Sequence, residues 1–297
     1  MNGMILDLSQ RLAAIQAKTL FFVCSSPKSG STWVQIMLDA HPRISCGGEG
    51  HFGDQLTPAL QRALDDYNRY IGWKNGQKIG NLDGYFTLGN LELTYLVRTA
   101  VLMQLARQTE GRSPAAIGEK TPDNIGALPL LEFIFPEAKF IHVVRDGRDC
   151  CVSGLFHNER LTPQWIEQAF GTTEAYVAQF ATNWARDQAA AARFAEKWPS
   201  RYMVVRYEDL VGDPTSGLIR MIDFLGVGHD GEILRECGSR GDFRRLSGGR
   251  GPGEEDHRSF FRKGVAGDWR NHLDTRLNDM FLEEAGAWLE HFGYARE

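Results

Sequence analysis

Residues 21–40 read FFVCSSPKSGSTWVQIMLDA, and this stretch contains the pattern that decides the fold. Its apolar start, 20–24, suits a fully buried parallel strand. Small residues then break the strand, and apolar residues recur afterwards at helical spacing. A strand, a small-residue loop and a helix start together form an anion site, because the first backbone N–H groups of a helix are unpaired and its dipole is positive there. The sequence therefore predicts that the loop holds phosphate.

The lysine of this loop does not stand where an ATP-binding loop needs it. Lys28 adds a full positive charge, and Gly30 lets an oxyanion approach the backbone closely. The pattern GxxxxGK[ST] places its lysine directly after the second glycine, whereas Lys28 lies before Gly30. The segment PKSGSTW instead resembles the 5′-phosphosulfate loop of sulfotransferases, whose donor is 3′-phosphoadenosine 5′-phosphosulfate (PAPS). The resemblance implies that the 5′-phosphosulfate is held by Lys28, Ser29, Gly30, Ser31 and Thr32, with Trp33 on or beside the adenine.

Composition is that of an ordinary soluble enzyme. The chain has 297 residues, of which 42% are hydrophobic and 24% charged, and this length suits two domains or one large α/β domain. The formal net charge of −5 argues against a broad nucleic-acid-binding surface. The five cysteines are odd in number and form no CxxC pair, so we expect neither a disulfide framework nor a zinc site. We expect no other metal site either.

The chain shows no targeting or membrane pattern. Residues 1–18 lack a basic start followed by a continuous apolar core, so they do not read as a signal peptide. They resemble a short amphipathic helix. Because no stretch approaches the length of a membrane span, we expect no membrane span and a cytoplasmic protein.

Strand and helix patterns alternate almost to the end of the chain. Strand patterns occur at 115–118, 139–144 and 201–207, and helical patterns at 91–108, 172–197, 214–225 and 274–291. Polar, glycine-rich segments occur at 41–54, 67–90 and 239–260. We expect segment 67–90 to be irregular and to shape the acceptor pocket, and segment 239–260 to be a mobile loop over the donor. The alternation predicts a central parallel sheet with helices on both faces, in one α/β domain over 1–297. The resemblance to sulfotransferases implies that this domain is a P-loop-like three-layer sandwich.

Two basic motifs resemble the 3′-phosphate site of the same family. RDGRDCCVS follows a buried strand, and from chemistry alone Arg145 suits either a phosphate or its own neighbouring aspartates equally well. The spacing resembles the sulfotransferase motif, which implies that Arg145 and Ser153 bind the 3′-phosphate. Near the carboxyl end, RKGVAGDW resembles the signature of cytosolic sulfotransferases. It implies that the same phosphate is clamped by Arg262, Lys263 and Gly264.

The segment RYEDLVGDP has two interpretations. Packing logic alone makes it a strand end followed by a capped helix. It also resembles the YEDL segment of the family, which places Tyr207 near the adenine.

A general base is needed because an acceptor hydroxyl loses its proton as it attacks sulfur. LDAHPRISCGGEGHF resembles the corresponding loop of tyrosylprotein sulfotransferases and, in its Glu-x-His-Phe, that of heparan-type enzymes. Both resemblances imply that Glu49 is the catalytic carboxylate, with His51 as its competitor. GEKTPDN resembles the heparan-type and bacterial segment, and it makes Lys120 a neighbour of Glu49 or of the acceptor.

The resemblance implies a bacterial-type soluble sulfotransferase with PAPS and a hydroxyl-bearing acceptor as partners, in-line transfer and a glutamate base. The acceptor, small molecule, sugar, lipid or peptide, and the choice of hydroxyl or amine stay open. The segment 270–279 departs from the dimer motif of cytosolic enzymes, so the oligomeric state also stays open. Two other classes remain: a P-loop-type kinase, which needs a differently placed lysine and a magnesium carboxylate, and a non-catalytic nucleotide-binding module.

Overall fold

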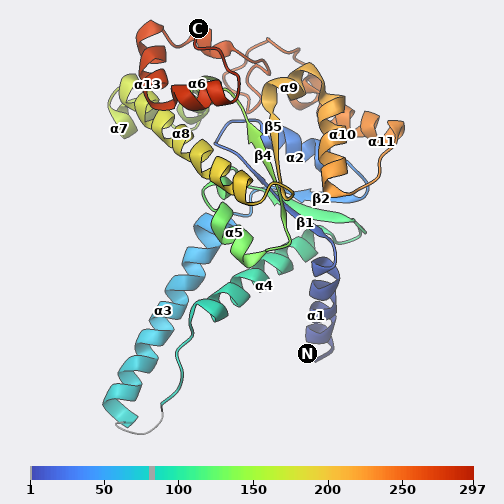
Figure 1. Cartoon of the computed structure of the whole chain (residues 1–297), viewed down its shortest axis with the longest axis vertical. Coiled ribbons are helices and arrows are strands. Elements are labelled where there is room, and N and C mark those ends of the chain that lie inside the picture. The colour runs from blue at the N-terminus through green and yellow to red at the C-terminus, as the bar shows by residue number, and fades with distance from the viewer. Residues whose placement is uncertain (1, 80–83) are drawn as a thin grey trace.

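The computed structural model describes residues 2–79 and 84–297 and confirms the α/β fold class. A five-stranded sheet has the order β2-β3-β1-β4-β5, and every neighbouring pair of strands is parallel (Figure 1). The strands are β1 (Thr19–Cys24), β2 (Ile44–Gly47), β3 (Ala116–Lys120), β4 (Lys139–Val144) and β5 (Tyr202–Arg206). All five carboxyl ends therefore lie at one edge of the sheet, where ligands bind in folds of this type.

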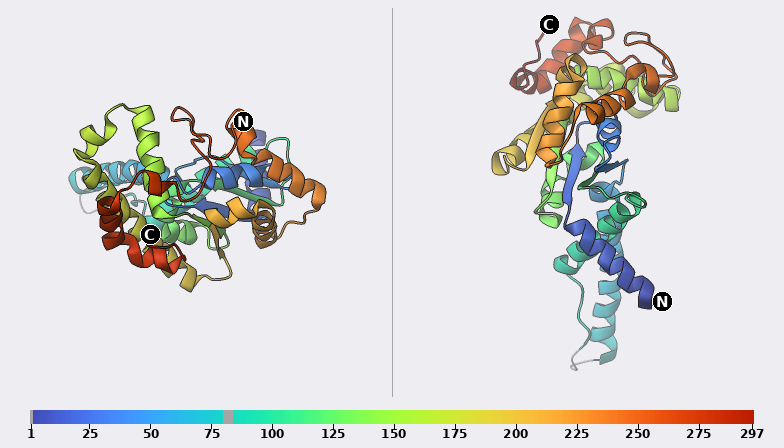
Figure 2. Two further views of the ribbon diagram at one scale, coloured as in Figure 1. Left: turned by 90° about the horizontal axis from the view of Figure 1, so that it is seen from above. Right: turned by 90° about the vertical axis from the view of Figure 1, so that its right-hand side faces the viewer.

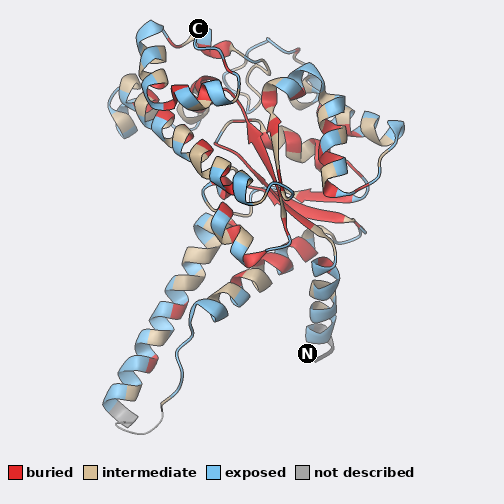
Figure 3. Cartoon of the chain, viewed as in Figure 1, coloured by how far each residue is buried: buried red, intermediate tan, exposed pale blue. Residues whose placement is uncertain are grey.

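Helices cover both faces of the sheet, as predicted. Alternate side chains of β1 point to opposite faces, so Phe21 and Val23 belong to one core cluster and Phe22 and Cys24 to another. The first cluster includes residues of α2 (Ser31–Asp39), α10 (Pro214–Leu225) and α11 (Gly231–Arg240). The second includes residues of α4 (Asn90–Gln108), α5 (Leu128–Ile134) and α8 (Thr173–Lys197). Figure 3 shows the buried strands between these layers.

A third core cluster lies beyond the carboxyl ends of the strands. It joins α6 (Gly147–Leu161) and α8 to α13 (Thr275–His291) through side chains such as Trp184, Trp269 and Phe281. These helices form the upper part of the molecule in Figure 1 and, seen from the side, in Figure 2. The remaining helical segments are α1 (Asn2–Gln16), η1 (Phe52–Leu56), α3 (Thr57–Lys74), η2 (Asn75–Ile79), η3 (Pro122–Ile125), α7 (Trp165–Phe170), α9 (Tyr207–Gly212), α12 (Phe243–Leu246) and η4 (Asp268–Asn271).

Two expected segments differ from the structure near the sheet. Segment 41–54, expected to be a loop, contains the edge strand β2, which pairs with β3. The strand expected at 115–118 continues through Lys120, because Glu119 and Lys120 still pair with β1. Parallel pairing with a neighbour fixes both segments as strands, and that partner is distant in sequence, so local composition does not reveal it.

The two expected surface segments are also more regular than predicted. Residues 67–74 are the end of the long helix α3, which extends away from the sheet (Figure 1), and residues 75–79 form η2. Residues 80–83 lie outside the described part. Segment 239–260 begins with the end of α11 and contains α12, so only its later part is free of helix. Within 2–79 and 84–297, no helix has both the length and the apolar character needed to cross a membrane.

Because β3 packs closely against β1, adding one methyl group at Gly118 is expected to destabilise the protein. A Cβ added to Gly118 would lie 2.2 Å from the carbonyl oxygen of Phe21, which is backbone and cannot move aside. We expect Gly118→Ala to lower the free energy of unfolding by roughly 1–3 kcal/mol, as overpacking does. Urea denaturation measures this change.

Gly72→Ala is the matched control, because Gly72 is exposed in α3 and an added Cβ there meets nothing within 4 Å. Removing a glycine from a helix interior is expected to raise stability by about 0.5–1 kcal/mol. Equal stabilities for the two variants would contradict the packing described for β3.

Candidate functional site

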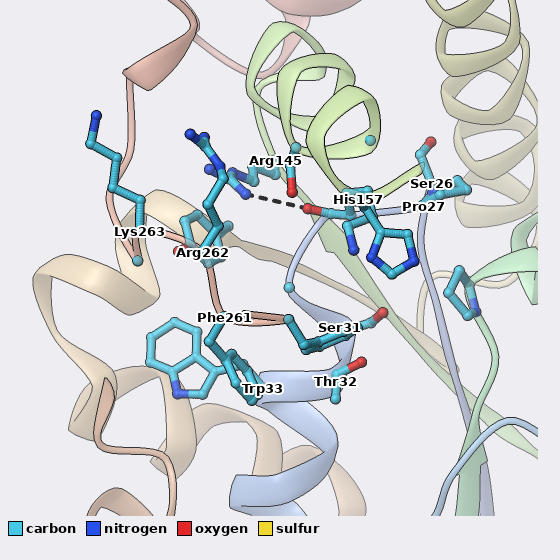
Figure 4. A pocket seen from close by; sticks show the side chains of 18 of the residues that line it. Ser26, Pro27, Ser31, Thr32, Trp33, Arg145, His157, Phe261, Arg262 and Lys263 are labelled. Carbon is cyan, nitrogen blue, oxygen red and sulfur yellow. Dashed lines mark hydrogen bonds between the residues drawn. The ribbon is translucent and has the colours of Figure 1, made fainter. Parts of the chain in front are cut away.

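A cavity of 670 Å³ opens at the carboxyl ends of the strands. Every strand contributes to its wall: the loop after β1 follows Cys24, and the other strands are followed by Glu49, Asp123, Arg145 and Tyr207. The segment 260–265 closes the cavity from the carboxyl-terminal part of the chain, and Figure 4 shows these side chains converging.

Most of the sequence-predicted site residues line this one cavity. They are Lys28, Gly30, Ser31, Thr32, Trp33, Glu49, Arg145, Ser153, Tyr207, Arg262, Lys263 and Gly264. Ser29 does not, because its buried hydroxyl donates to the carbonyl oxygen of Ser26 at 2.8 Å and so braces the loop from within. His51 and Lys120 lie behind Glu49 rather than on the wall. None of the described residues of 67–90 lines the cavity, since α3 carries them away from it.

The loop after β1 can adopt its shape only with glycine at position 30. Gly30 has φ of 92° and directly precedes α2, and a Cβ there would lie 2.6 Å from the ring of Tyr207. The backbone of Lys28 is also in the left-handed region, with φ of 68°. Ser25 Oγ donates to Ser31 Oγ at 3.1 Å and ties the two ends of the loop together. The first turn of α2, with its free N–H groups, thus opens directly onto the cavity.

Lys28 is a cation in crowded positive surroundings. Burial, followed by the charges of Arg160 and Arg145, lowers the pKa of its ammonium group to about 8. Its Nζ lies 4.7 Å from the centre of the Phe260 ring, which covers the lysine. An anion placed here would relieve the repulsion among these cations, so the electrostatics favour a phosphate or sulfate group.

Arg145 binds the loops around it. It donates to the carbonyl oxygens of Lys28 at 3.3 Å and Val265 at 3.0 Å, and its guanidinium lies 4.4 Å from the centre of the Tyr207 ring. An ion pair with Asp149 at 3.5 Å completes its surroundings. Both interpretations weighed for this arginine are therefore present in part: it faces the cavity, and it also pairs with a neighbouring aspartate.

Arg262 and Lys263 also reach the cavity, but both are ion-paired. Asp268 accepts from Arg262 and from Lys263, each at 2.5 Å, and Glu255 forms a second ion pair with Arg262. Burial alone would raise the pKa of the Asp268 carboxyl, but these cations and Asn271 hold it far below its usual range. Arg262 and Lys263 can therefore bind an anion, and in its absence the carboxylates of Asp268 and Glu255 balance their charge.

Glu49 is the centre of a chain of charged groups. Its Oε1 accepts from Lys120 Nζ at 2.5 Å, and its Oε2 lies 3.5 Å from His51 Nε2. His51 Nδ1 contacts Asp54 at 3.0 Å, so the imidazole bridges two carboxylates. Burial would raise the pKa of Glu49, but the hydrogen bond and charge of Lys120 outweigh burial and lower it. Glu49 is therefore ionised near neutral pH and can accept a proton, while His51 is occupied on both sides.

Two groups of potential metal ligands come together that sequence spacing did not indicate. They are His51, Asp54 and Asp123, and Glu255, Asp268 and His272, with ligand atoms within 4.8 Å of one another. In the second group the carboxylates pair with Arg262 and Lys263, which accounts for their clustering without an ion.

Sequence reasoning missed one wall of the cavity. Tyr176, Phe180, Asn183 and Asp187 line it from α8, at spacings that place them on one helix face. His157 lines it from α6, one helical turn after Ser153. The spacing from Ser153 to His157 is the signal that would have found the histidine, because two residues four apart share a helix face.

A family model described as the sulfotransferase family matches residues 21–231. The chain belongs to the sulfotransferase family. It is 26% identical over 224 residues to protein-tyrosine sulfotransferase 2 of Gallus gallus, covering 72% of this chain and 53% of that protein. It thus spans about half the length of that relative. It is 22% identical over 275 residues to sulfotransferase 1C2 of Rattus norvegicus, covering 88% of this chain and 80% of the relative.

The three-dimensional fold is also similar to that of sulfotransferases. The structure of mouse sulfotransferase SULT7A1 complexed with PAP superposes with a TM-score of 0.57 and 18% identity, over 96% of this chain and 89% of the other. Sulfotransferase structures therefore share this sheet and its covering helices.

The charge balance around Lys28 predicts its reactivity. Because its pKa is about 8, competitive acetylation of the protein from about pH 6 to about pH 10 should show half-maximal reactivity of Lys28 near pH 8. Arg160→Met should raise that midpoint, since it removes a repelling charge. Peptide mass spectrometry measures the acetylation of Lys28. The exposed Lys74 serves as the reference lysine, whose acetylation shows that the reagent is active at each pH. A midpoint near that of a free lysine, or no response to Arg160→Met, would refute these electrostatics.

Proposed function

We propose that this protein transfers a sulfuryl group from PAPS to a hydroxyl or amine of an acceptor. One observation carries the proposal: a single cavity joins the loop of Lys28, the cations Arg262 and Lys263, and the carboxylate Glu49. The first two suit the two phosphates of a bisphosphorylated nucleotide, and the third suits proton removal. The mouse relative, whose structure contains PAP, supports the choice of nucleotide.

The nucleotide is proposed to lie across the strand ends. Its 5′-phosphosulfate rests on Lys28 and the first turn of α2, and its adenine lies between Trp33 and the neighbouring wall of Phe243 and Leu246. The 3′-phosphate faces Arg145, Ser153 and the segment Arg262–Gly264. These assignments keep the roles that the sequence motifs imply, and each residue except Ser29 presents its side chain or backbone to the cavity.

In this proposal the acceptor lies against the face of α8 that lines the cavity. Its oxygen attacks sulfur, a new O–S bond forms, and its proton passes to the Glu49 carboxylate. The S–O bond to the 5′-phosphate breaks, and its electron pair stays on the phosphate oxygen, which leaves as part of 3′-phosphoadenosine 5′-phosphate (PAP). Lys28 stabilises the negative charge that grows on that oxygen. Positive side chains supply the charge compensation in this scheme, so we propose that transfer needs no metal ion.

Donor binding tests the proposal directly. PAP should raise the midpoint of thermal unfolding, because a ligand that binds only the folded state adds about 2.7 kcal/mol at a hundredfold excess over its Kd. Magnesium ATP should stabilise far less, because Lys28 is not in the ATP-type position. The reverse preference would move the protein to the kinase class, and binding without turnover of any acceptor would favour the non-catalytic module.

Glu255→Gln should tighten PAP binding by roughly three- to tenfold, since it removes the carboxylate that competes with a phosphate for Arg262. Glu254→Gln is the matched control, because Glu254 accepts from the backbone of Gly251 instead. Isothermal titration calorimetry gives both affinities. If Glu255→Gln binds PAP no better than Glu254→Gln, Arg262 does not hold a phosphate.

The base assignment predicts a specific loss. Glu49→Gln keeps the size of the side chain but cannot accept a proton, so transfer should fall by about 10²–10⁴-fold while PAP affinity hardly changes. Because Lys120 lowers the pKa of Glu49, the wild-type rate should not depend on this ionisation near neutral pH. Single-turnover rates, with an acceptor found by screening phenols, sugars, lipids and peptides against labelled PAPS, measure the effect.

His51→Ala is the control, because it lies in the same loop and would report general loop damage. We expect a much smaller loss from it, since His51 only bridges Glu49 and Asp54. An active Glu49→Gln beside an inactive His51→Ala would make the histidine the base.

A further inference from the structure

His157 lines the cavity of the proposed reaction site, and no sequence motif assigns it a role. It projects from α6 into the cavity, near the loop of Ser26, Pro27 and Ser31 (Figure 4). The Phe260 ring lies edge-on to it at 5.9 Å and also lies 4.7 Å from Lys28 Nζ. One phenyl ring therefore contacts both groups and places His157 beside the lysine.

The histidine is held in a single tautomer by its neighbour. Arg160 NH2 lies 3.2 Å from His157 Nδ1. A guanidinium group only donates hydrogen bonds, so Nδ1 must be the accepting nitrogen. In a neutral imidazole the other nitrogen then carries the hydrogen, and Nε2 is a donor.

The surroundings also keep the ring neutral. Burial, then the charges of Lys28 and Arg160, lower the pKa of His157 to about 4, and the charge of Glu49 opposes them. Lys28, Arg160 and Glu49 are thus the charged groups that act on the ring. A neutral imidazole whose accepting nitrogen is already bonded to Arg160 cannot take a proton from an acceptor. His157 is therefore excluded as the general base, and its remaining ability is to donate.

The group that would receive this hydrogen bond follows from the positions of the neighbours. In the proposed reaction, Lys28 faces the leaving phosphate oxygen and Glu49 faces the acceptor proton. The sulfuryl group moves between these two positions. His157 lies beside Lys28 and is acted on by the charge of Glu49, so it lies near the sulfuryl group. A donor to the attacking oxygen would weaken the nucleophile. The sulfuryl oxygens, by contrast, only accept hydrogen bonds, and they match a donor.

We propose that His157 donates its Nε2–H to a sulfuryl oxygen during transfer and so acts as a neutral catalytic donor beside Lys28. This inference rests on the proposed function. The bonds formed and broken are those given above, and the His157 proton stays on the ring throughout. Arg160 acts as a positioning residue, because its hydrogen bond to Nδ1 selects the donating tautomer.

Two substitutions separate a donor from a packing residue. Gln retains an N–H donor at similar reach, while Phe keeps a planar ring without a donor. We expect PAP affinity to stay within about twofold of wild type in both, because PAP lacks the sulfuryl group. The single-turnover rate should fall by about 10–100-fold in His157→Phe and stay within about fivefold of wild type in His157→Gln.

Calorimetry with PAP and rapid-quench transfer from labelled PAPS give the two readouts. Equal rates for the Gln and Phe variants, or unchanged rates in both, would overturn the donor role. Loss of PAP affinity parallel to the loss of rate would also overturn it and make His157 a packing residue. A wild-type protein that binds no PAP or transfers no sulfuryl group would instead refute the proposed function, and this inference with it.

Discussion

The ring of Tyr207 is the contact on which the geometry of the site depends. It packs so closely against Gly30 that a Cβ there would lie 2.6 Å away, it carries the guanidinium of Arg145 at 4.4 Å, and it meets Trp33 edge-on at 5.7 Å. These neighbours follow β1 and β4, and Tyr207 itself follows β5, so one side chain sets the spacing of three loops. The two interpretations of the YEDL segment are thus compatible, because Tyr207 is buried and also lines the cavity.

Charge is the second constraint on this site. Lys28, Arg145, Arg262 and Lys263 converge on one cavity in a chain whose net charge is −5. Such a group of cations is costly to assemble in a partly buried site. The structure limits the cost with internal carboxylates: Asp149 faces Arg145, and Asp268 and Glu255 face the two cations near the carboxyl end. Carboxylates do not fully balance the charge of Lys28. There burial, together with the charges of Arg160 and Arg145, lowers the pKa of the ammonium group.

Sequence patterns predicted the parts of this protein that local chemistry determines. A few neighbouring residues are enough to predict the continuous apolar strand β1, the small-residue loop after it and the amphipathic helix α10. The strand β2 does not, because ISCG becomes a strand only through pairing with β3. The helix α3 was not predicted: no helical pattern was assigned to 57–66, and over 67–74 its glycine and asparagine residues are typical of loops.

The same division applies to the site. Lys28, Arg262 and Glu49 stand in recognisable motifs, and the fold brings them to one cavity. The aromatic and polar face of α8 and His157 belong to no motif, since only the packing of α6, α8 and the sheet brings them there. The pairing of Glu255 with Arg262 is equally invisible in sequence, because it depends on how the segment before the RKG motif folds back.

The walls of the cavity come from separate parts of the chain, and this has a consequence for divergence within the family. The loop after β1, the strand ends and the RKG segment line one part of the wall, and one face of the 25-residue helix α8 lines another. On that face Asp187 accepts a hydrogen bond from Ser26 Oγ at 3.0 Å and so holds the loop after β1, whereas the Phe180 ring packs against Tyr176 of the same helix. Divergence in such a family would therefore reshape the cavity through positions like Phe180, while Asp187 would change only together with the loop that it holds.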